Sequence, residues 1–234
     1  MGRGWIHGKV LAVGAKKGKL FTKLAREITI AAKTGGAIAD NNPRLKMALQ
    51  EARKNSMPRD TIERALNRAT GDGQEGAIEE LTYEGYGPHG VAMLVETQTD
   101  NKNRTVQDLR AIFVRGDGNL GEPGSVMWMF DRVGSIIAEK EGFSGDPEEA
   151  AIEAGADDVE PIEETTQFRF ISSVESLFEV KDALEAASWE VEKAELSYKP
   201  KTPMEITDEQ EKDLIELVDK LNDHDDVKTI HLAL

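Results

Sequence analysis

The spacing of apolar residues changes near residue 78, and this change limits the folds open to the chain more than any other feature of its sequence. Before it, apolar residues recur at intervals of three and four, the period of an amphipathic helix. After it, short apolar runs alternate with polar residues, which is typical of strands, and further helical stretches lie between them. A helical segment followed by mixed strands and helices predicts an α+β protein with more than one domain.

The first part predicts a bundle of three helices, in the segments FTKLAREITIAAKTGG, NPRLKMALQEARKNS and SMPRDTIERALNRATG. Gly35 supplies a stop for the first helix. Asn42 caps the second helix, and Pro43 stands at its first position, where a missing N–H costs nothing. The apolar stripes of the three helices would face one another, so their polar residues would form the outside of the bundle.

Two series of strands and helices follow. The first series begins with a hairpin at 81–98, continues with a helix capped by Thr105, and returns as a strand in GSVMWMFDR. The second series starts at residue 134 and has the order β-α-β-β-α-β. The last segment of the chain contains a capping box, Thr207 with Gln210, followed by an amphipathic helix and a strand.

The first series lacks one helix and one strand, and the end of the chain provides both. We therefore expect the second series to be inserted into a discontinuous middle domain. The predicted domains are a basic helical domain with its N-terminal tail at 1–78, a middle domain at 79–131 plus 206–234, and an acidic inserted domain at 132–205. We expect each of the last two to be a small antiparallel sheet with helices on one face, of ferredoxin-like type.

Charge is distributed unevenly between these parts. Lys and Arg number 29 against 44 Asp and Glu, for a net charge of -15. The first 70 residues nevertheless hold 15 basic and 5 acidic residues, a net charge of +10, so the remainder carries −25. A basic part within an acidic chain indicates that this part binds a polyanion.

Basic side chains on the outer faces of the helices are the predicted nucleic-acid contacts. They are Lys16, Lys17, Lys19, Lys23, Arg26, Lys33, Lys46, Arg53, Lys54, Arg64 and Arg68. Each phosphate that such a residue neutralises releases counterions, so we expect salt-sensitive binding. Aromatic residues are nearly absent here, and Phe21 has the spacing of a core residue. We therefore expect contact with the backbone of structured nucleic acid rather than stacking on single strands.

Polar and aromatic residues also gather on predicted loops of the middle domain. Turn chemistry explains the glycines and the proline of these loops, but it does not explain the other side chains. The unexplained residues are Tyr83, Tyr86, Asn101, Asn103, Arg104 and Asn119. Because loops on a rigid scaffold are common sites of recognition, we regard these as candidate recognition residues.

Several classes of protein are excluded or disfavoured. The absence of Cys excludes a disulfide scaffold, a cysteine nucleophile and zinc sites built on Cys, and we predict no metal site and no cofactor. Gly85, Gly87 and Gly90 spell GxGxxG, but a strand follows where a dinucleotide site needs a helix. No apolar run reaches the roughly 20 residues of a membrane helix, so we expect no membrane partner and a cytoplasmic location. No catalytic constellation is present, which leaves an enzyme using carboxylates of the inserted domain as a remote alternative.

Four segments carry a family resemblance: KGKLFTKLAREITIAAKTGG, NPRLKMALQEARKNSMPRDTIERALNRATG, YEGYGPHGVAMLVETQTDNKNRTVQDLR and GNLGEPGSVMWMF. In this order they resemble the signature blocks of the YebC/PmpR family, whose mitochondrial relatives are translational activators of a cytochrome oxidase subunit. The resemblance is close over 16–130 and general over the rest. It implies three domains and a non-enzymatic, DNA-binding transcriptional regulator, with another line of the family acting on ribosomes, including at proline stretches.

The N-terminus departs from the family pattern. Trp5 is kept, but Ile6 and the apolar residues 10–13 replace much of the basic charge that the family has there. We therefore expect weaker contact by this tail than in other members.

Two functions stay open on the sequence. The first is a DNA-binding transcriptional regulator that uses the basic helical domain. The second is a translation factor or translational activator associated with the ribosome, which binds ribosomal RNA and relieves stalling at proline stretches. In either case, the acidic domains would orient the protein by repulsion or contact a protein partner such as a ribosomal one.

Overall fold

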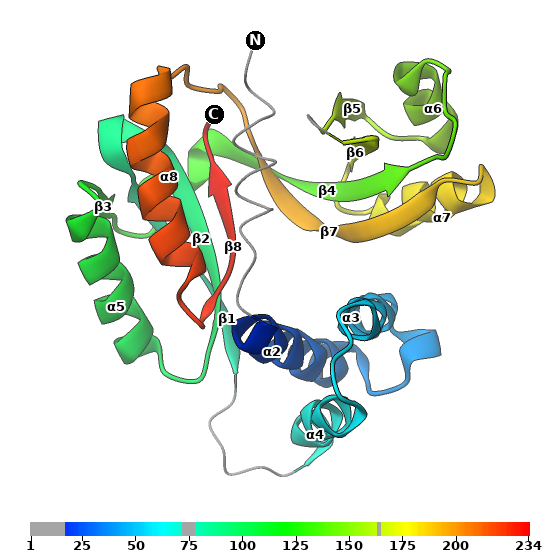
Figure 1. The fold of residues 1–234 in the computed structure, drawn as a ribbon, viewed down its shortest axis with the longest axis horizontal. Helices are drawn as coiled ribbons and strands as arrows, with labels where there is room; N and C mark the ends of the chain where they lie inside the picture. The colour runs from blue at the N-terminus through cyan, green and yellow to red at the C-terminus, as the bar shows by residue number, and fades with distance from the viewer. Residues whose placement is uncertain (1–16, 72–77, 163–164) are drawn as a thin grey trace. The chain divides into compact units, whose positions relative to one another are not determined.

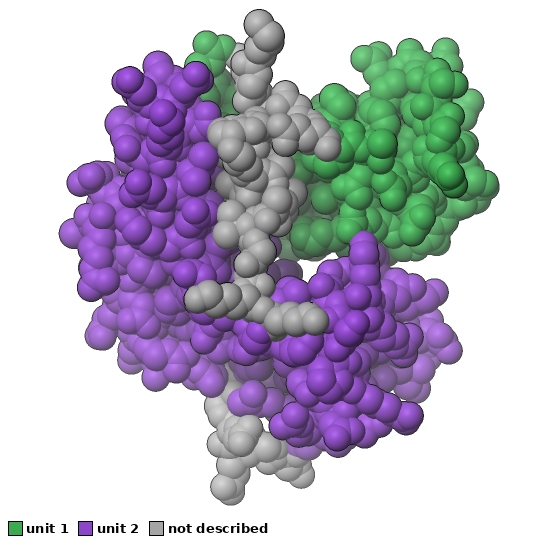
Figure 2. Space-filling model, viewed as in Figure 1, with its two compact units in different colours: residues 1–12, 128–205, 233–234 green, residues 13–127, 206–232 purple. Residues whose placement is uncertain are grey.

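The computed structural model describes residues 17–71, 78–162 and 165–234. These residues form two compact units, coloured in Figure 2. We call 17–71, 78–127 and 206–232 the helix–sheet unit, because it contains the helical bundle and the first sheet. We call 128–162, 165–205 and 233–234 the acidic unit.

The helix–sheet unit begins with three helices and continues with four strands and two further helices within the described ranges. Its elements are α2 (Lys17–Gly35), a 3-10 turn (Ala39–Asn41), α3 (Pro43–Lys54), α4 (Arg59–Thr70), β1 (Glu79–Tyr86), a 3-10 turn (Pro88–Gly90), β2 (Ala92–Thr99), α5 (Lys102–Arg115), β3 (Asn119–Leu120), α8 (Asp208–Asn222) and β8 (Val227–Leu232).

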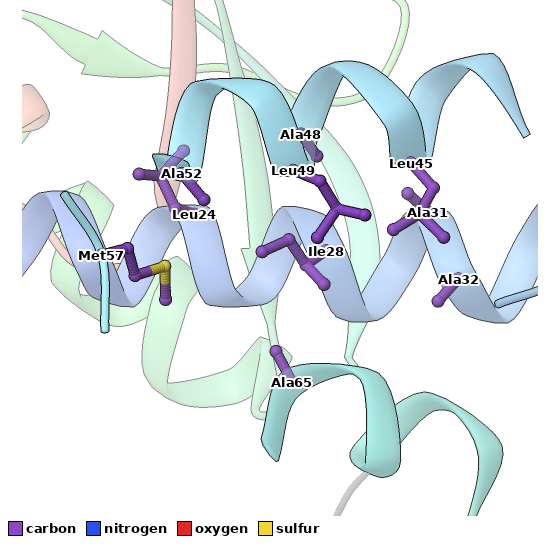
Figure 3. Close-up of a cluster of buried hydrophobic side chains, with 10 residues drawn as sticks. All are labelled: Leu24, Ile28, Ala31, Ala32, Leu45, Ala48, Leu49, Ala52, Met57 and Ala65. Atoms are coloured by element: carbon purple, nitrogen blue, oxygen red, sulfur yellow. The ribbon is translucent and has the colours of Figure 1, made fainter. Parts of the chain in front are cut away.

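The bundle is built around α2, which packs against both α3 and α4 (Figure 3). Ile28 of α2 and Leu49 of α3 point toward one another, and Ala65 of α4 faces α2 from the opposite side. The backbone N–H of Leu45 donates to the Asn42 side chain at 3.0 Å, which confirms the predicted cap of α3. These contacts leave the basic faces of the helices outside the core.

The first sheet has the order β3-β1-β2-β8, and every neighbouring pair is antiparallel. α5 and α8 pack on it (Figure 1) through buried side chains such as Phe113 and Leu217. Gly85 is required for packing, because a Cβ there would lie 2.8 Å from the Asn119 carbonyl oxygen and from the Phe113 ring. The GxGxxG sequence thus belongs to a hairpin and its turn.

The acidic unit is a second antiparallel sheet with two helices, in the order β5-β6-β4-β7. It follows a 3-10 turn at Met127–Met129, and its elements are β4 (Phe130–Glu139), α6 (Pro147–Ala154), β5 (Asp158–Pro161), β6 (Gln167–Ser172), α7 (Leu177–Ala186) and β7 (Glu190–Pro200). Its core contains a cluster of aromatic rings centred on Trp189, which lies within 4.8 to 5.8 Å, between ring centroids, of Phe143, Phe168 and Phe170.

The predicted fold class is confirmed: a helical region precedes two antiparallel sheets, and the second sheet interrupts the first, because β8 pairs with β2. Two local predictions are wrong. The segments GSVMWMFDR and GSIIAEK do not form separate strands, since 130–139 is the single strand β4 of the second sheet. The strand beside β1 is instead the two-residue β3.

The cap of α5 also differs from the prediction. The helix begins at Lys102, and Asn101 is the cap, because its side chain accepts the Arg104 N–H at 3.1 Å. Thr105 lies inside the helix and is fully buried, with its hydroxyl 2.7 Å from the Asp226 carboxylate. In the described ranges, no helix combines the length and apolar character needed to cross a lipid bilayer.

Candidate nucleic-acid interface

The basic residues predicted on the bundle fall into two groups that differ in exposure. The exposed group is Lys33, Lys46, Arg53, Lys54, Arg64 and Arg68. The half-buried group is Lys19, Lys23 and Arg26, all on α2. Lys16 lies outside the described residues, and Lys17 opens α2 with a side chain that is also outside the description.

The half-buried group contacts the loop at the C-terminal end of α8. The three side chains donate to the backbone carbonyls of Asp223 at 2.6 Å, Asn222 at 2.8 Å and Asp225, in chain order. The last carbonyls of a helix lack partners within it and carry partial negative charge, so cations are stabilised there. Burial lowers the pKa of the Lys23 ammonium group. This row of cations therefore attaches the bundle to the first sheet.

Asp226 strengthens the same attachment. Its carboxylate is 2 % exposed and pairs with Arg26 at 2.9 Å and with Arg104 at 3.0 Å. Burial disfavours the carboxylate, but hydrogen bonds from Thr105 and Arg104 and the charge of Arg26 outweigh it and keep its pKa below the usual range. One buried carboxylate thus connects α2, α5 and the turn before β8.

A second ionic cluster connects the bundle to the sheet through Arg44. Its guanidinium lies 2.6 Å from the Glu27 carboxylate and 2.6 Å from that of Glu80, and Lys228 lies 3.3 Å from Glu27. Burial opposes the charge of Glu27, yet the hydrogen bond from Arg44 and the charge of Lys228 lower its pKa to about 2. Both ionic clusters use residues from segments far apart in the sequence.

Two exposed arginines of α4 border a groove between α2 and α4 that measures about 690 Å³. Its lining residues are Phe21, Thr22, Ala25, Arg26, Thr29, Thr61, Arg64, Ala65, Asn67, Arg68, Gly71, Ile78 and Asp100. The structure thus brings Arg26, Arg64 and Arg68 together. The exposed cations of α3 lie elsewhere, because α3 packs on the opposite side of α2 from α4 (Figure 3).

Arg64 presents its charge to the groove. Its Nε donates to the Asp60 carbonyl at 3.2 Å and one terminal nitrogen donates to the Thr61 hydroxyl at 3.1 Å. No carboxylate in the described ranges pairs with it, and the residue is exposed. Its positive charge is therefore available to an anion, and Arg68 stands one turn further along the same helix.

The prediction that the candidate recognition residues lie on loops is wrong for most of them, because β1 contains Tyr83 and Tyr86, α5 contains Asn103 and Arg104, and β3 contains Asn119. Asn101 caps α5, Arg104 pairs with Asp226, Tyr83 is half-buried on β1, and the Tyr86 hydroxyl donates to the Ser125 carbonyl at 3.2 Å; Asn103 and Asn119 are exposed. Burial raises the pKa of the Tyr83 hydroxyl. Several of these side chains therefore have contacts within the fold.

Two residues have roles that sequence reasoning missed, one in the interior and one at the groove. Glu84 is 6 % exposed, and its carboxylate accepts the backbone N–H groups of Gly124 at 2.6 Å, Val126 at 2.8 Å and Met127 at 2.7 Å. The sequence did offer one signal for this role: a glutamate within an apolar strand needs hydrogen-bond donors, and a glycine-rich loop can supply them from its backbone. Phe21, expected in the core, lines the groove as well as packing on the core.

Together, the fold and this surface define a class: an α+β protein whose basic helical bundle carries an arginine-bordered groove, as polyanion-binding proteins do. Within the described ranges, no group of three or more His, Asp or Glu side chains is arranged to hold a metal ion. The family follows from comparison with known proteins. The chain belongs to the TACO1/YebC family, because residues 4–72 match the model of its N-terminal domain and 78–234 match that of its second and third domains.

Relatives with these domains are similar over nearly their whole length. A "Probable transcriptional regulatory protein Bd1964" of Bdellovibrio bacteriovorus is 50% identical over 235 residues, covering 100% of both chains. A "Probable transcriptional regulatory protein" of Geotalea uraniireducens is 47% identical, covering 97% of this chain and 91% of its own. The crystal structure of a conserved hypothetical protein, Aq1575, from Aquifex aeolicus has the same fold, with a TM-score of 0.86 and 39% identity, covering 95% of this chain and 91% of its own.

Proposed function

We propose that this chain is a nucleic-acid-binding regulatory protein that contacts DNA phosphates through its basic helical bundle and so controls transcription. The observation that carries the proposal is the pair Arg64 and Arg68, which stand exposed one turn apart on α4 at the edge of the groove. The names of the relatives, transcriptional regulatory proteins, support the same role. The role is binding rather than catalysis, and its place is the cytoplasm, which holds the DNA of bacteria such as those relatives' sources.

Other predicted residues take secondary parts in the proposal. The exposed cations Lys33, Lys46, Arg53 and Lys54 would contact phosphates at the periphery. Lys19, Lys23 and Arg26 of α2 already donate to carbonyls of the loop after α8, so we propose that they contribute less to nucleic-acid binding. Asn103 and Asn119, both exposed, remain candidate contacts of the first sheet, and the acidic unit is a candidate surface for a protein partner.

The test measures binding of the full chain to labelled duplex DNA by fluorescence anisotropy over a range of salt concentrations. We expect Arg64→Ala and Arg68→Ala each to weaken binding severalfold at low salt, because each removes a phosphate contact. Each variant should also lower the slope of log affinity against log salt by about 1. Arg132→Ala, an exposed arginine of the acidic unit, is the matched control and should bind as the unchanged protein does.

Two results would count against the proposal. Unchanged affinity and salt slope in both α4 variants would remove the assignment of this surface. Stronger association with ribosomes than with DNA at physiological salt, lost in the same variants, would keep the surface but replace transcription with translation as the process that the protein regulates.

A further inference from the structure

The groove between α2 and α4 differs from a plain cationic surface because its floor is apolar. Phe21 and Ile78 are half-buried and line it, and Ala25 and Ala65 close it between the helices. Its volume of about 690 Å³ lies within the range of small-molecule sites, roughly 300–1,000 Å³. Phe21, Ala25 and Ala65 also belong to the core of the bundle or pack against it, and their faces in the groove offer an apolar surface that a phosphate does not use.

The rim of the groove carries hydrogen-bonding groups of both kinds. Arg64, Asn67 and Arg68 supply donors from α4, and the exposed Thr22 hydroxyl stands on α2. Among the lining residues of the described chain, the one carboxylate is that of Asp100. One of its oxygens accepts from Arg104 at 3.1 Å, which leaves acceptor capacity on the other. The site therefore combines anion-binding donors, an apolar surface and an acceptor.

We infer that this groove holds one unpaired nucleotide of a nucleic acid, with its base against Phe21 and Ile78 and its phosphate on Arg64 and Arg68. The inference rests on the proposed function and specifies the nucleic acid as one with an accessible single-stranded position. It departs from the sequence-based expectation, which favoured contact with the backbone of structured nucleic acid over stacking on single strands.

An unpaired nucleotide fits the groove for a geometric reason. In a duplex, the base faces are stacked on one another, so only phosphates, sugars and base edges meet the protein. A base must leave the stack before its flat face can rest on a side-chain surface, as it does in single strands and loops. A duplex would therefore use the arginines and leave the apolar floor empty.

The carboxylate of Asp100 predicts a preference among bases. Cytosine, adenine and guanine carry an exocyclic amine that can donate to a carboxylate. Thymine and uracil lack this amine, and two carbonyl oxygens flank their ring N–H and would repel the carboxylate. We expect a cytosine strand to bind more tightly than a thymine strand, a comparison in which both bases are pyrimidines.

The experiment fills the groove without removing a positive charge. Asn67→Trp, at an exposed position of α4, and Thr22→Phe, at an exposed position of α2, each add bulk to the lining. Gln50→Trp is the matched control, because Gln50 is exposed on α3 and does not line the groove. The probes are labelled cytosine and thymine single strands of about 15 nucleotides and a duplex of the same length.

We expect both groove-filling variants to bind the cytosine strand at least about tenfold more weakly than the unchanged protein, with duplex binding altered less than about twofold. Gln50→Trp should bind both probes normally. Cytosine-strand binding that is unchanged, or that weakens only in step with duplex binding, would overturn the inference and leave the proposed function standing. Failure of the unchanged protein to bind any probe would instead remove the proposed function.

Discussion

Glu27 is a single residue on which the attachment of the bundle to the sheet depends. Its carboxylate, 20% exposed, lies between Arg44 and Lys228 and has a pKa of about 2, against an ordinary value of 4.5. A pKa that is lower in the folded protein means that the charged form stabilises the fold. This stabilisation is complete above about pH 4.5 and disappears as the pH falls toward 2.

We therefore predict that Glu27→Gln lowers the free energy of unfolding by up to about 3 kcal/mol at neutral pH, the value of so large a lowering of the pKa. The difference from the unchanged protein should shrink between pH 4.5 and pH 2, because the native carboxylate gains its proton there. Urea unfolding across that pH range measures it. Glu63→Gln, in an exposed pair with Arg59, is the control and should change stability by less than about 0.5 kcal/mol. A constant difference across the whole range would contradict the assignment.

At the scale of single residues, the sequence predicted the hydrogen-bonding role of a side chain where its partner is close in the chain. Asn42 and the capping box of Thr207 and Gln210 were found because their hydrogen bonds join residues three apart. Thr105 was misassigned as a cap because its partner, Asp226, lies 121 residues away. Glu84 was missed for the same reason, since the N–H groups that it binds belong to a loop 40 residues later.

At the scale of elements, amphipathic spacing predicted the helices. It could not distinguish the polar residues that contact other parts of the protein from those that are exposed to solvent. Lys23 and Arg64 have the same pattern of apolar neighbours, yet one contacts the α8 loop and the other faces the groove. The spacing of apolar residues shows which face of a helix points away from the core of the bundle. It does not show whether another part of the protein covers that face. The division of the predicted cations therefore required the structure.

This division gives a prediction for α2 and α4. Arg26→Glu should lower the free energy of unfolding by about 3 kcal/mol or more, because it places a carboxylate beside the buried Asp226. Arg64→Glu should change it by less than about 0.5 kcal/mol, because Arg64 is exposed and pairs with no carboxylate in the described ranges. Urea unfolding of both variants at neutral pH makes the comparison. Equal stability of the two variants would show that the α2 contacts contribute little.

At the scale of the whole molecule, the net charge of -15 conceals two parts of opposite sign. The first 70 residues carry +10, whereas residues 128–205 hold 7 basic and 20 acidic residues, a net charge of −13. A polyanion is attracted by the first part and repelled by the second, and both forces act over a Debye length. The sequence alone was sufficient for this property, because it depends on composition by segment and on no specific contact.

The repulsion by the acidic unit should be measurable as an association rate. Glu148, Glu149 and Glu153 are exposed on α6, so changing all three to Gln removes negative charge without disturbing the core. We expect association with nucleic acid to become about two- to fivefold faster at 0.01 M salt, where the Debye length is about 30 Å, and to be unchanged at 1 M, where it is about 3 Å. Stopped-flow fluorescence gives the rates, and the triple change to Asp, which keeps the charge, is the control. Equal rates for the Gln and Asp variants at low salt would mean that the acidic unit does not act on the nucleic acid through its electric field.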